Sequence, residues 1–377
     1  MLKQYPTARF ILQRGGWYFI TFLVAVTINF FLPRMGTSDP VEIIMGQSAG
    51  GLSEEAAHAK KNALLKDFGM AKVDDQGNVI EQKVKSQRKV WDTVTKSDIM
   101  VDVYTSEAVR TSSLEQFGAY VKRCLQGDLG TSYIKNKKVS ELILDAIPWT
   151  LALQLPTIVF GWIVGNLLGA LAAYRRGNFD RIFFPVALFV SAVPFFVFGM
   201  LLVYVFAIQF PIFPPTGGFD PGMVREFTFE FFASAAYYYV LPFFSIFLIL
   251  AGGQAIGMRS MGIYELGTDY IKYAKWLGLK EGRVLMYLFR NAMLPQLTGL
   301  ALSLGTMIGG ALITEMIFSY PGLGLAILTA IQNNDYPLIQ GCTLLVTVCV
   351  LVANFTVDIL IGFLDPRVKA GLQMGGN

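Results

Sequence analysis

The sequence contains few of the residues from which most catalytic and metal sites are built. Its 377 residues include three cysteines and one histidine, and charged residues make up only 15%. Cys342 and Cys349 stand at i and i+7 and Cys124 has no obvious mate, so neither a disulfide framework nor a zinc cluster is predicted. His58 lies in a charged segment, which indicates a solvated side chain. No Gly-x-x-x-x-Gly-Lys-Ser/Thr motif occurs, so we expect no cofactor and no nucleotide hydrolysis by this chain itself.

Apolar residues, in contrast, are abundant. Hydrophobic residues make up 54% of the chain and the mean hydropathy is +0.49, which is unusual for a water-soluble domain. Several apolar runs approach the roughly 20 residues that cross a bilayer core. We therefore predict an all-α integral membrane protein. Six transmembrane helices are expected, at 17–32, 148–174, 182–209, 237–258, 296–318 and 338–364.

The distribution of Lys and Arg predicts how the spans are oriented. These residues crowd the N-terminus, the 175–181 turn, the 259–290 loop and the tail, whereas the 319–337 loop has none. Short loops rich in Lys and Arg stay in the cytoplasm, while a long loop crosses the membrane regardless of its charge. Both termini are therefore expected in the cytoplasm. The first apolar run ends in Pro33-Arg34 without a small-residue cleavage site, which favours a retained span over a signal peptide.

The long segment between the first two spans is expected to be a separate, extracytoplasmic part. Helices are predicted at 53–68 and 113–126, because each apolar pattern is followed by a stop glycine. Residues 98–104 alternate polar and apolar side chains, which indicates a strand. The predicted organisation is the N-terminus with the first span at 1–35, the outer segment at 36–147, a five-helix membrane core at 148–366 and a cytoplasmic tail at 367–377.

Glycines and prolines inside the spans are candidates for helix packing and for bends. Glycines that recur every four residues let another helix approach closely. Proline is tolerated in a bundle where neighbours satisfy the freed carbonyls, and it often marks a bend along a pathway. Pro185 and Pro194 lie in the third span, and for each a structural kink is the alternative. The packing glycines are Gly161, Gly165 and Gly169 in the second span, with Gly305 and Gly309 in the fifth.

Two carboxylates lie in the last two spans, Glu315 and Asp358. A charged side chain at the bilayer centre costs about 3 kcal/mol on insertion scales, so neither is expected to face lipid unpaired. One interpretation is a hydrogen bond to a neighbouring helix near the interface. The other is a position on the substrate path or its gate. Asn166 and Gln254 are interpreted as interhelical hydrogen-bond partners.

The stretch 259–295 separates two apolar runs and predicts a short amphipathic helix. Thr268 or Asp269 can cap its start, and Gly278 stands where a left-handed cap would end it. Lys272 and Lys275 point away from its apolar face. Such a face either folds back on the membrane bundle or docks on a cytoplasmic partner. The predicted face consists of Tyr270, Tyr273, Ala274 and Leu277.

This stretch resembles the cytoplasmic coupling loop of ABC importer permeases of the dipeptide/oligopeptide family. The general importer pattern opens with Glu-Ala-Ala, whereas this sequence has Lys272-Tyr273-Ala274. The segment 127–133, Gly-Asp-Leu-Gly-Thr-Ser-Tyr, also resembles the family, while 71–112 has no counterpart and is interpreted as an insertion. The matching residues of the loop are Asp269, Tyr270, Ala274, Gly278, Leu279 and the run Arg-Asn-Ala-Met-Leu-Pro at 290–295.

The resemblance implies a transport subunit in a bacterial or archaeal cytoplasmic membrane, forming half of a translocation pathway. It implies four partners: a second permease, two ATP-binding subunits that hydrolyse ATP, and an extracytoplasmic binding protein. Peptides, oligosaccharides and nickel chelates all remain open as substrates. Glu315, Asp358 and Pro194 become candidates for the pathway. The residues expected to couple to the ATPase are Asp269, Tyr270, Tyr273, Ala274, Lys275, Leu277, Gly278 and Leu279.

Two other classes of protein are less consistent with the sequence. A secondary transporter driven by an ion gradient usually has internal repeats and paired charges at the membrane midplane, and the sequence has neither. An intramembrane enzyme needs a nucleophile and base, or a metal, inside the spans. The single histidine lies outside them.

Overall fold

A computed structural model describes residues 6–32, 40–48, 53–74, 76–92, 97–132, 134–175 and 177–364. The predicted tail at 367–377 lies outside the described residues. The chain divides into two compact units, which are treated separately. The larger unit contains residues 1–25, 141–329 and 342–377, and the smaller unit contains residues 26–140 and 330–341.

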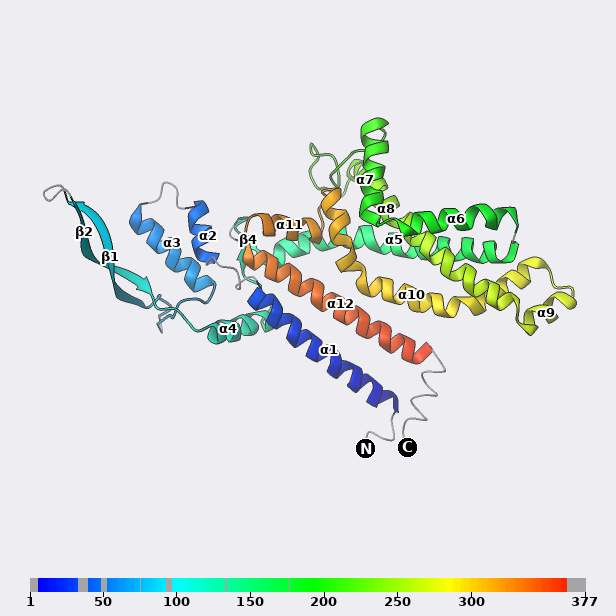
Figure 1. The fold of residues 1–377 in the computed structure, drawn as a ribbon, viewed down its shortest axis with the longest axis horizontal. Coiled ribbons are helices and arrows are strands. Elements are labelled where there is room, and N and C mark those ends of the chain that lie inside the picture. Colours follow the sequence, from blue (N-terminus) through cyan, green and yellow to red (C-terminus); the bar gives the residue numbers. More distant parts are fainter. Residues whose placement is uncertain are drawn as a thin grey trace. The chain divides into compact units, whose positions relative to one another are not determined.

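The larger unit consists of long apolar helices (Figure 1). Within the described residues, four helices are long and apolar enough to cross a membrane, over Ile11–Phe31, Val139–Arg175, Phe229–Leu266 and Tyr336–Ile359. A bent pair of helices counts as a fifth span if the two are taken together. The helices are α1 (Pro6–Phe31), α5 (Val139–Arg175), α6 (Asn178–Ala192), α7 (Phe195–Val203), a π-helical turn (Tyr204–Gln209), α8 (Phe229–Leu266), α9 (Asp269–Trp276), α10 (Glu281–Ile317), α11 (Leu323–Gln332) and α12 (Tyr336–Leu364). The end of α1, the end of α11 and the start of α12 belong to the smaller unit.

The third predicted span is not one continuous helix. It breaks after α6, and α7 leaves at 97° to it, as the two green helices in Figure 1 show. Val193 is extended (φ −78°, ψ 128°) and Pro194 caps the start of α7. A proline disfavours helical backbone in the residue before it, which explains the break at this point. Pro185 lies inside α6 without breaking it.

The contact between α5 and α8 depends on glycine. A Cβ atom added to Gly161 would lie 2.5 Å from Leu250 Cδ2, and one added to Gly169 would lie 2.9 Å from the Cα of Ala255. At Gly165 the added atom would lie 2.7 Å from Gln254 Cβ. At Gly165 and Gly169 the added atom would also meet the backbone of α8, so a larger residue there would push the helices apart, whereas at Gly161 the Leu250 side chain can move aside. Gly305 and Gly309 lie in α10, where the surroundings of the 305–311 side chains fall outside the described part of the chain.

The smaller unit has helices α2 (Pro40–Ser48), α3 (Glu54–Asp67) and α4 (Ser113–Leu125). The two predicted helices, at 53–68 and 113–126, are confirmed as α3 and α4, and local sequence signals set the ends of both. Ser53 and Ser112 cap α3 and α4 through their hydroxyls, and Ser112 forms a capping box with Glu115. The stop glycines Gly69 and Gly127 adopt positive φ, at 65° and 76°.

The expectation of an all-α fold is wrong for this unit. Strands β1 (Glu81–Asp92) and β2 (Ser97–Ala108) pair as an antiparallel hairpin, with Val90 opposite Ile99. The alternation at 98–104 predicted part of β2, but β1 is rich in Lys and Gln and carries little strand signal. Two short strands, β3 (Thr131–Ser132) and β4 (Lys137–Lys138), also pair. The core of the unit contains Val41, Ile44, Leu64, Leu65, Phe68, Met70 and Ala71, with Val79 and Ala108 from the hairpin base packed against it.

Candidate functional site

The helix α9 ends in a glycine cap that fixes the direction of the following chain. The Gly278 amide donates to Lys275 O at 3.0 Å and the Leu279 amide donates to Ala274 O at 3.2 Å. These two bonds form a Schellman motif, and Gly278 has the left-handed φ of 69° that the motif requires. The predicted cap is therefore confirmed. At the start of the helix, Thr268 occupies the cap position, but its hydroxyl donates to Glu265 O at 2.5 Å instead of capping α9.

One side of α9 is packed into the larger unit. Ile271 and Ala274 are buried in a cluster with Ala170 of α5, Met258 of α8, and Val284, Leu288 and Ala292 of α10. The prediction that Ala274 shares one apolar face with Tyr273 and Leu277 is therefore wrong, because Ala274 is buried and the other two are exposed. The helix has apolar residues on two sides, and Ile271 and Ala274 are the ones that pack against the bundle.

The opposite side of α9 exposes three large apolar residues, which we call the exposed α9 face. Tyr273, Trp276 and Leu277 are 61%, 77% and 77% exposed. The Tyr273 and Trp276 rings meet edge to face with centroids 5.5 Å apart. Trp276 was not among the residues predicted from the sequence, although it follows Tyr273 at i+3 and precedes Leu277. A largely exposed apolar group of this size on one short helix is typical of a docking surface.

Polar contacts hold the flanks of α9. Lys272 pairs with Asp269 at 2.9 Å, and Lys275 lies 5.8 Å from the ring centroid of Tyr174. The Tyr270 hydroxyl donates to a carboxylate oxygen of Glu265. Burial and that hydrogen bond raise the pKa of Tyr270 above its usual value, so the phenol remains a neutral donor at physiological pH.

Glu315 is fully buried at the end of α10 and binds the start of α11. Its Oε2 accepts a 2.5 Å hydrogen bond from the Gly324 amide, while Oε1 has no hydrogen-bond partner among the described residues. A negative charge is favourable at the N-terminus of a helix. The loop fits tightly around the carboxylate, because a Cβ atom on Gly322 would overlap it. The neighbouring Leu323 amide donates to Thr150 Oγ1 of α5 at 2.9 Å.

Asp358 interacts with α1. Its Oδ2 lies 3.3 Å from Arg14 Nη1 and accepts a hydrogen bond from the Tyr18 hydroxyl at 2.9 Å. The Tyr18 ring also meets Phe355 at 5.5 Å. Asp358 therefore has the helix-joining contacts of the first of the two sequence interpretations. The structure brings the predicted coupling residues together on α9, whereas Glu315 and Asp358 bind different elements.

Comparison with known proteins gives the family. Residues 165–370 match the family described as binding-protein-dependent transport system inner membrane component. The di/tripeptide transport system permease protein DppB of Pseudomonas aeruginosa is 30% identical, over 96% of this chain and 98% of the relative. The dipeptide transport system permease protein DppB of Escherichia coli is 29% identical over the same shares. The oligopeptide transport system permease protein AppB of Bacillus subtilis is 33% identical, over 72% of this chain and 88% of the relative.

The chain belongs to this permease family. It is a multi-pass component of the inner membrane, in a family of ABC permeases that carry no ATPase of their own. Membership implies that the permease works with a binding protein and with ATPase partners.

A polar cluster inside the permease differs from the sequence-based interpretation. The Asn166 amide donates to Trp162 O of its own helix at 2.7 Å, so the predicted interhelical bond is wrong for this group. The interhelical bond is made instead by Trp162, whose Nε1 donates to Gln296 O of α10 at 2.8 Å. Gln254 packs against Gly165 of α5. The indole of Trp162 gave no signal in the sequence, because a tryptophan in a span is also typical of a lipid interface.

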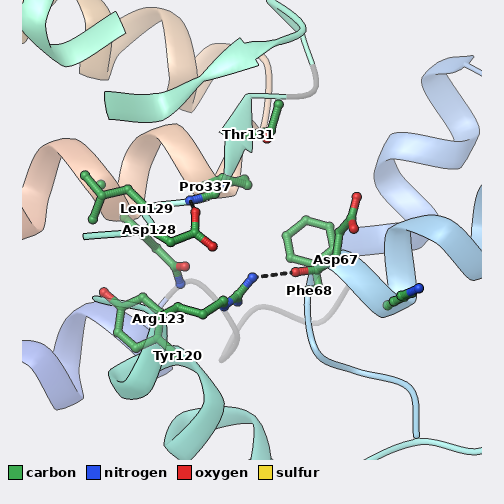
Figure 2. Close-up of a pocket in the computed structure, with 12 residues that line it drawn as sticks. Asp67, Phe68, Tyr120, Arg123, Asp128, Leu129, Thr131 and Pro337 are labelled. Carbon is green, nitrogen blue, oxygen red and sulfur yellow. Dashed lines mark hydrogen bonds between the residues drawn. The ribbon is translucent and has the colours of Figure 1, made fainter. Parts of the chain in front are cut away.

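Residues 128–131 of the family-like segment line a cavity of about 290 Å³ in the smaller unit of the permease (Figure 2). Phe68 and Tyr120 are buried in its wall, and Arg123 donates to Asp67 O at 2.8 Å. Asp128 accepts from the Gly130 amide at 3.0 Å, which shapes the turn. Next to it, the buried Ser132 hydroxyl donates to a carboxylate oxygen of the buried Asp335. This segment therefore joins α3, α4 and the start of α12 within the unit.

Proposed function

We propose that this permease forms half of the translocation pathway of an ATP-driven importer of short peptides. A second, similar permease supplies the other half, and a binding protein outside the membrane delivers the ligand. Two ATP-binding subunits hydrolyse the nucleotide. The substrate class is supported by the relatives, which are named as dipeptide, di/tripeptide and oligopeptide permeases.

The observation that carries the proposal is the two-sided packing of α9. Ile271 and Ala274 join the helix to α5, α8 and α10, while Tyr273, Trp276 and Leu277 remain exposed. A helix packed in this way transfers a displacement of its exposed side to three membrane helices. In the proposed cycle, ATP binding closes the two ATPase subunits, and their movement displaces the docked α9. The membrane bundle then changes from an inward-facing to an outward-facing state.

The proposed topology has six spans with both termini in the cytoplasm. The spans are α1, α5, the bent pair α6 and α7, α8, α10 and α12. The segment 36–147 is extracytoplasmic, and α9 faces the cytoplasm within the coupling loop 259–295. The support is the distribution of Lys and Arg, which is dense at 259–290 and absent at 319–337.

Glu315, Asp358 and Pro194 remain the proposed pathway residues. For Glu315 the support is a buried carboxylate that keeps one oxygen without a partner in the described part of the chain. For Pro194 the support is the 97° bend. Asp358 has weaker support, because Arg14 and Tyr18 already bind it.

The test is uptake by the purified assembly in proteoliposomes. We expect a labelled dipeptide to accumulate only with ATP on the ATPase side and with the cognate binding protein on the other side. Uptake driven by an ion gradient without ATP would contradict the proposal. Uptake of an oligosaccharide or a nickel chelate in place of the peptide would retain the machinery and change the substrate.

A further inference from the structure

The helix α4 has two apolar stripes, and only one of them is covered. Phe117 and Tyr120 face the last turn of α1. The Phe117 ring lies 5.3 Å from Phe30 and 5.7 Å from Phe31, and Tyr120 lies 5.3 Å from Phe30. The Asn29 amide donates to the Tyr120 hydroxyl at 3.1 Å. These contacts fix α4 against the end of α1.

The second stripe lies beside the first and is open. At 100° per residue, Leu114, Val121 and Leu125 fall within one narrow arc of α4. Leu114 is 77% exposed and Leu125 is 82% exposed, while Val121 between them is half-buried. Ala119 and Lys122 lie on the polar arc that follows, and both are exposed. Contacts within the smaller unit therefore leave most of this apolar stripe of α4 uncovered.

The position of α4 along α1 indicates what covers this stripe. The candidate span in α1 ends at Phe31, so its last turn reaches the boundary between hydrocarbon and headgroups. A helix packed against Asn29, Phe30 and Phe31 lies at the same depth. Ile28 and Leu32 of that turn are also exposed, at 54% and 64%, as expected for residues that face lipid. The open stripe of α4 thus continues a surface that the membrane already covers.

We propose that α4 is an interfacial helix whose stripe of Leu114, Val121 and Leu125 is inserted into the lipid surface around the end of α1. Amphipathic helices of this kind lie in the membrane plane with the apolar face buried about 5–10 Å at the headgroup boundary. The opposite side of the helix, with Tyr120 and Arg123, lines the cavity in Figure 2. Membrane contact at α4 therefore orients the wall of that cavity. The inference requires only that α1 spans the membrane.

The test uses spin labels on the full chain in vesicles of phosphatidylcholine and phosphatidylglycerol. Single cysteines are placed at Leu114, Val121 and Leu125, with Ala119 and Lys122 as matched controls, in a background with the three natural cysteines replaced by alanine. We measure the collision of each label with oxygen, which partitions into lipid, and with a water-soluble nickel chelate. The expected result is an oxygen-to-nickel ratio several-fold higher on the stripe than at the controls.

Three results would overturn the inference. Efficient collision of the Leu114 and Leu125 labels with the nickel chelate would place the stripe in water. Shielding of both labels from both reagents, measured on the chain alone and on the complete transporter, would mean that protein covers the stripe. Shielding found only in the complete transporter would assign the surface to a partner subunit.

Discussion

Arg259 of α8 binds Asp180 of α6 in a bidentate geometry. Nε donates to Oδ1 at 2.5 Å and Nη2 donates to Oδ2 at 2.6 Å, and the guanidinium lies 4.0 Å from the ring centroid of Phe184. The side chains are only 19% and 15% exposed. The pair therefore joins the start of α6 to the part of α8 that precedes α9, next to the buried Met258.

Breaking this pair is expected to destabilise the permease. Asp180→Asn should cost about 3 kcal/mol, because a partly buried guanidinium loses its counter-charge. The measurement is the apparent melting temperature of the purified protein. The exchange Asp180→Arg with Arg259→Asp should restore part of the loss. As a control, Asp269→Asn removes the exposed pair with Lys272 and should cost less than about 1 kcal/mol. Equal losses in the two single variants would contradict the expectation.

The glycine cap of α9 should be essential for coupling. Gly278→Leu forces a branched side chain into left-handed backbone, at about 1–2 kcal/mol, and adds bulk beside the exposed α9 face. We expect insertion in the membrane and ATP hydrolysis to persist while peptide uptake falls. The matched control is Gly282→Leu, at an ordinary helical position that also has nothing within 4 Å of an added Cβ. Normal uptake by the Gly278→Leu variant would refute the role of the cap.

A double-mutant cycle tests the contact between Glu315 and Gly322. In the native protein, Gly322→Ala drives a methyl group into the carboxylate, and overpacking of this kind costs about 1–3 kcal/mol. With Glu315→Ala as background, the space is vacant and the same substitution should cost almost nothing. The readout is again the melting temperature. Additive effects of the two substitutions would show that the residues do not interact.

The proposed topology predicts a simple labelling pattern. In a background without natural cysteines, a cysteine at Asn333 should react with an impermeant thiol reagent added outside the cell. A cysteine at Lys280, directly after the α9 cap, should react only after the membrane is permeabilised. The reverse pattern would overturn the six-span arrangement and the cytoplasmic position of α9.

The hairpin at 81–108 is expected to help seat the binding protein. Its ends are close together, since the Lys72 amide donates to Val109 O at 2.8 Å, so a short Gly-Ser linker can replace residues 73–110. We expect the variant to assemble with its partners and to lose much of the ATPase stimulation by liganded binding protein. Stimulation and assembly both at the native level would exclude a docking role for the hairpin.

Local signals in the sequence were sufficient for the short helices. Gly69, Gly127 and Gly278 each act on the backbone within a few residues, so the C-terminal ends of α3, α4 and α9 could be predicted from them. The orientation of α9 could not. Apolar residues lie on two sides of that helix, and the choice of Ile271 and Ala274 as the packed pair depends on the space beside Met258 and Ala170.

The bend of the third span and the partner of Glu315 were also beyond the sequence. Pro185 and Pro194 look alike in the chain, yet α6 continues past the first and ends before the second. In the sequence, Gly324 resembles an ordinary turn residue, although its amide donates a hydrogen bond to the carboxylate of Glu315, nine positions earlier. Both outcomes depend on contacts between elements, which no local pattern contains.

The burial of Ile271 and Ala274 also has a mechanical consequence. Because these side chains are buried against α5, α8 and α10, a displacement of α9 is expected to move all three helices with it. The substitution Ile271→Ala would leave a cavity that lets α9 move relative to α5, α8 and α10, while the exposed α9 face stays intact. In the proposed cycle, the ATPases would still bind and hydrolyse ATP, but part of their movement would be lost in the cavity before the membrane helices move.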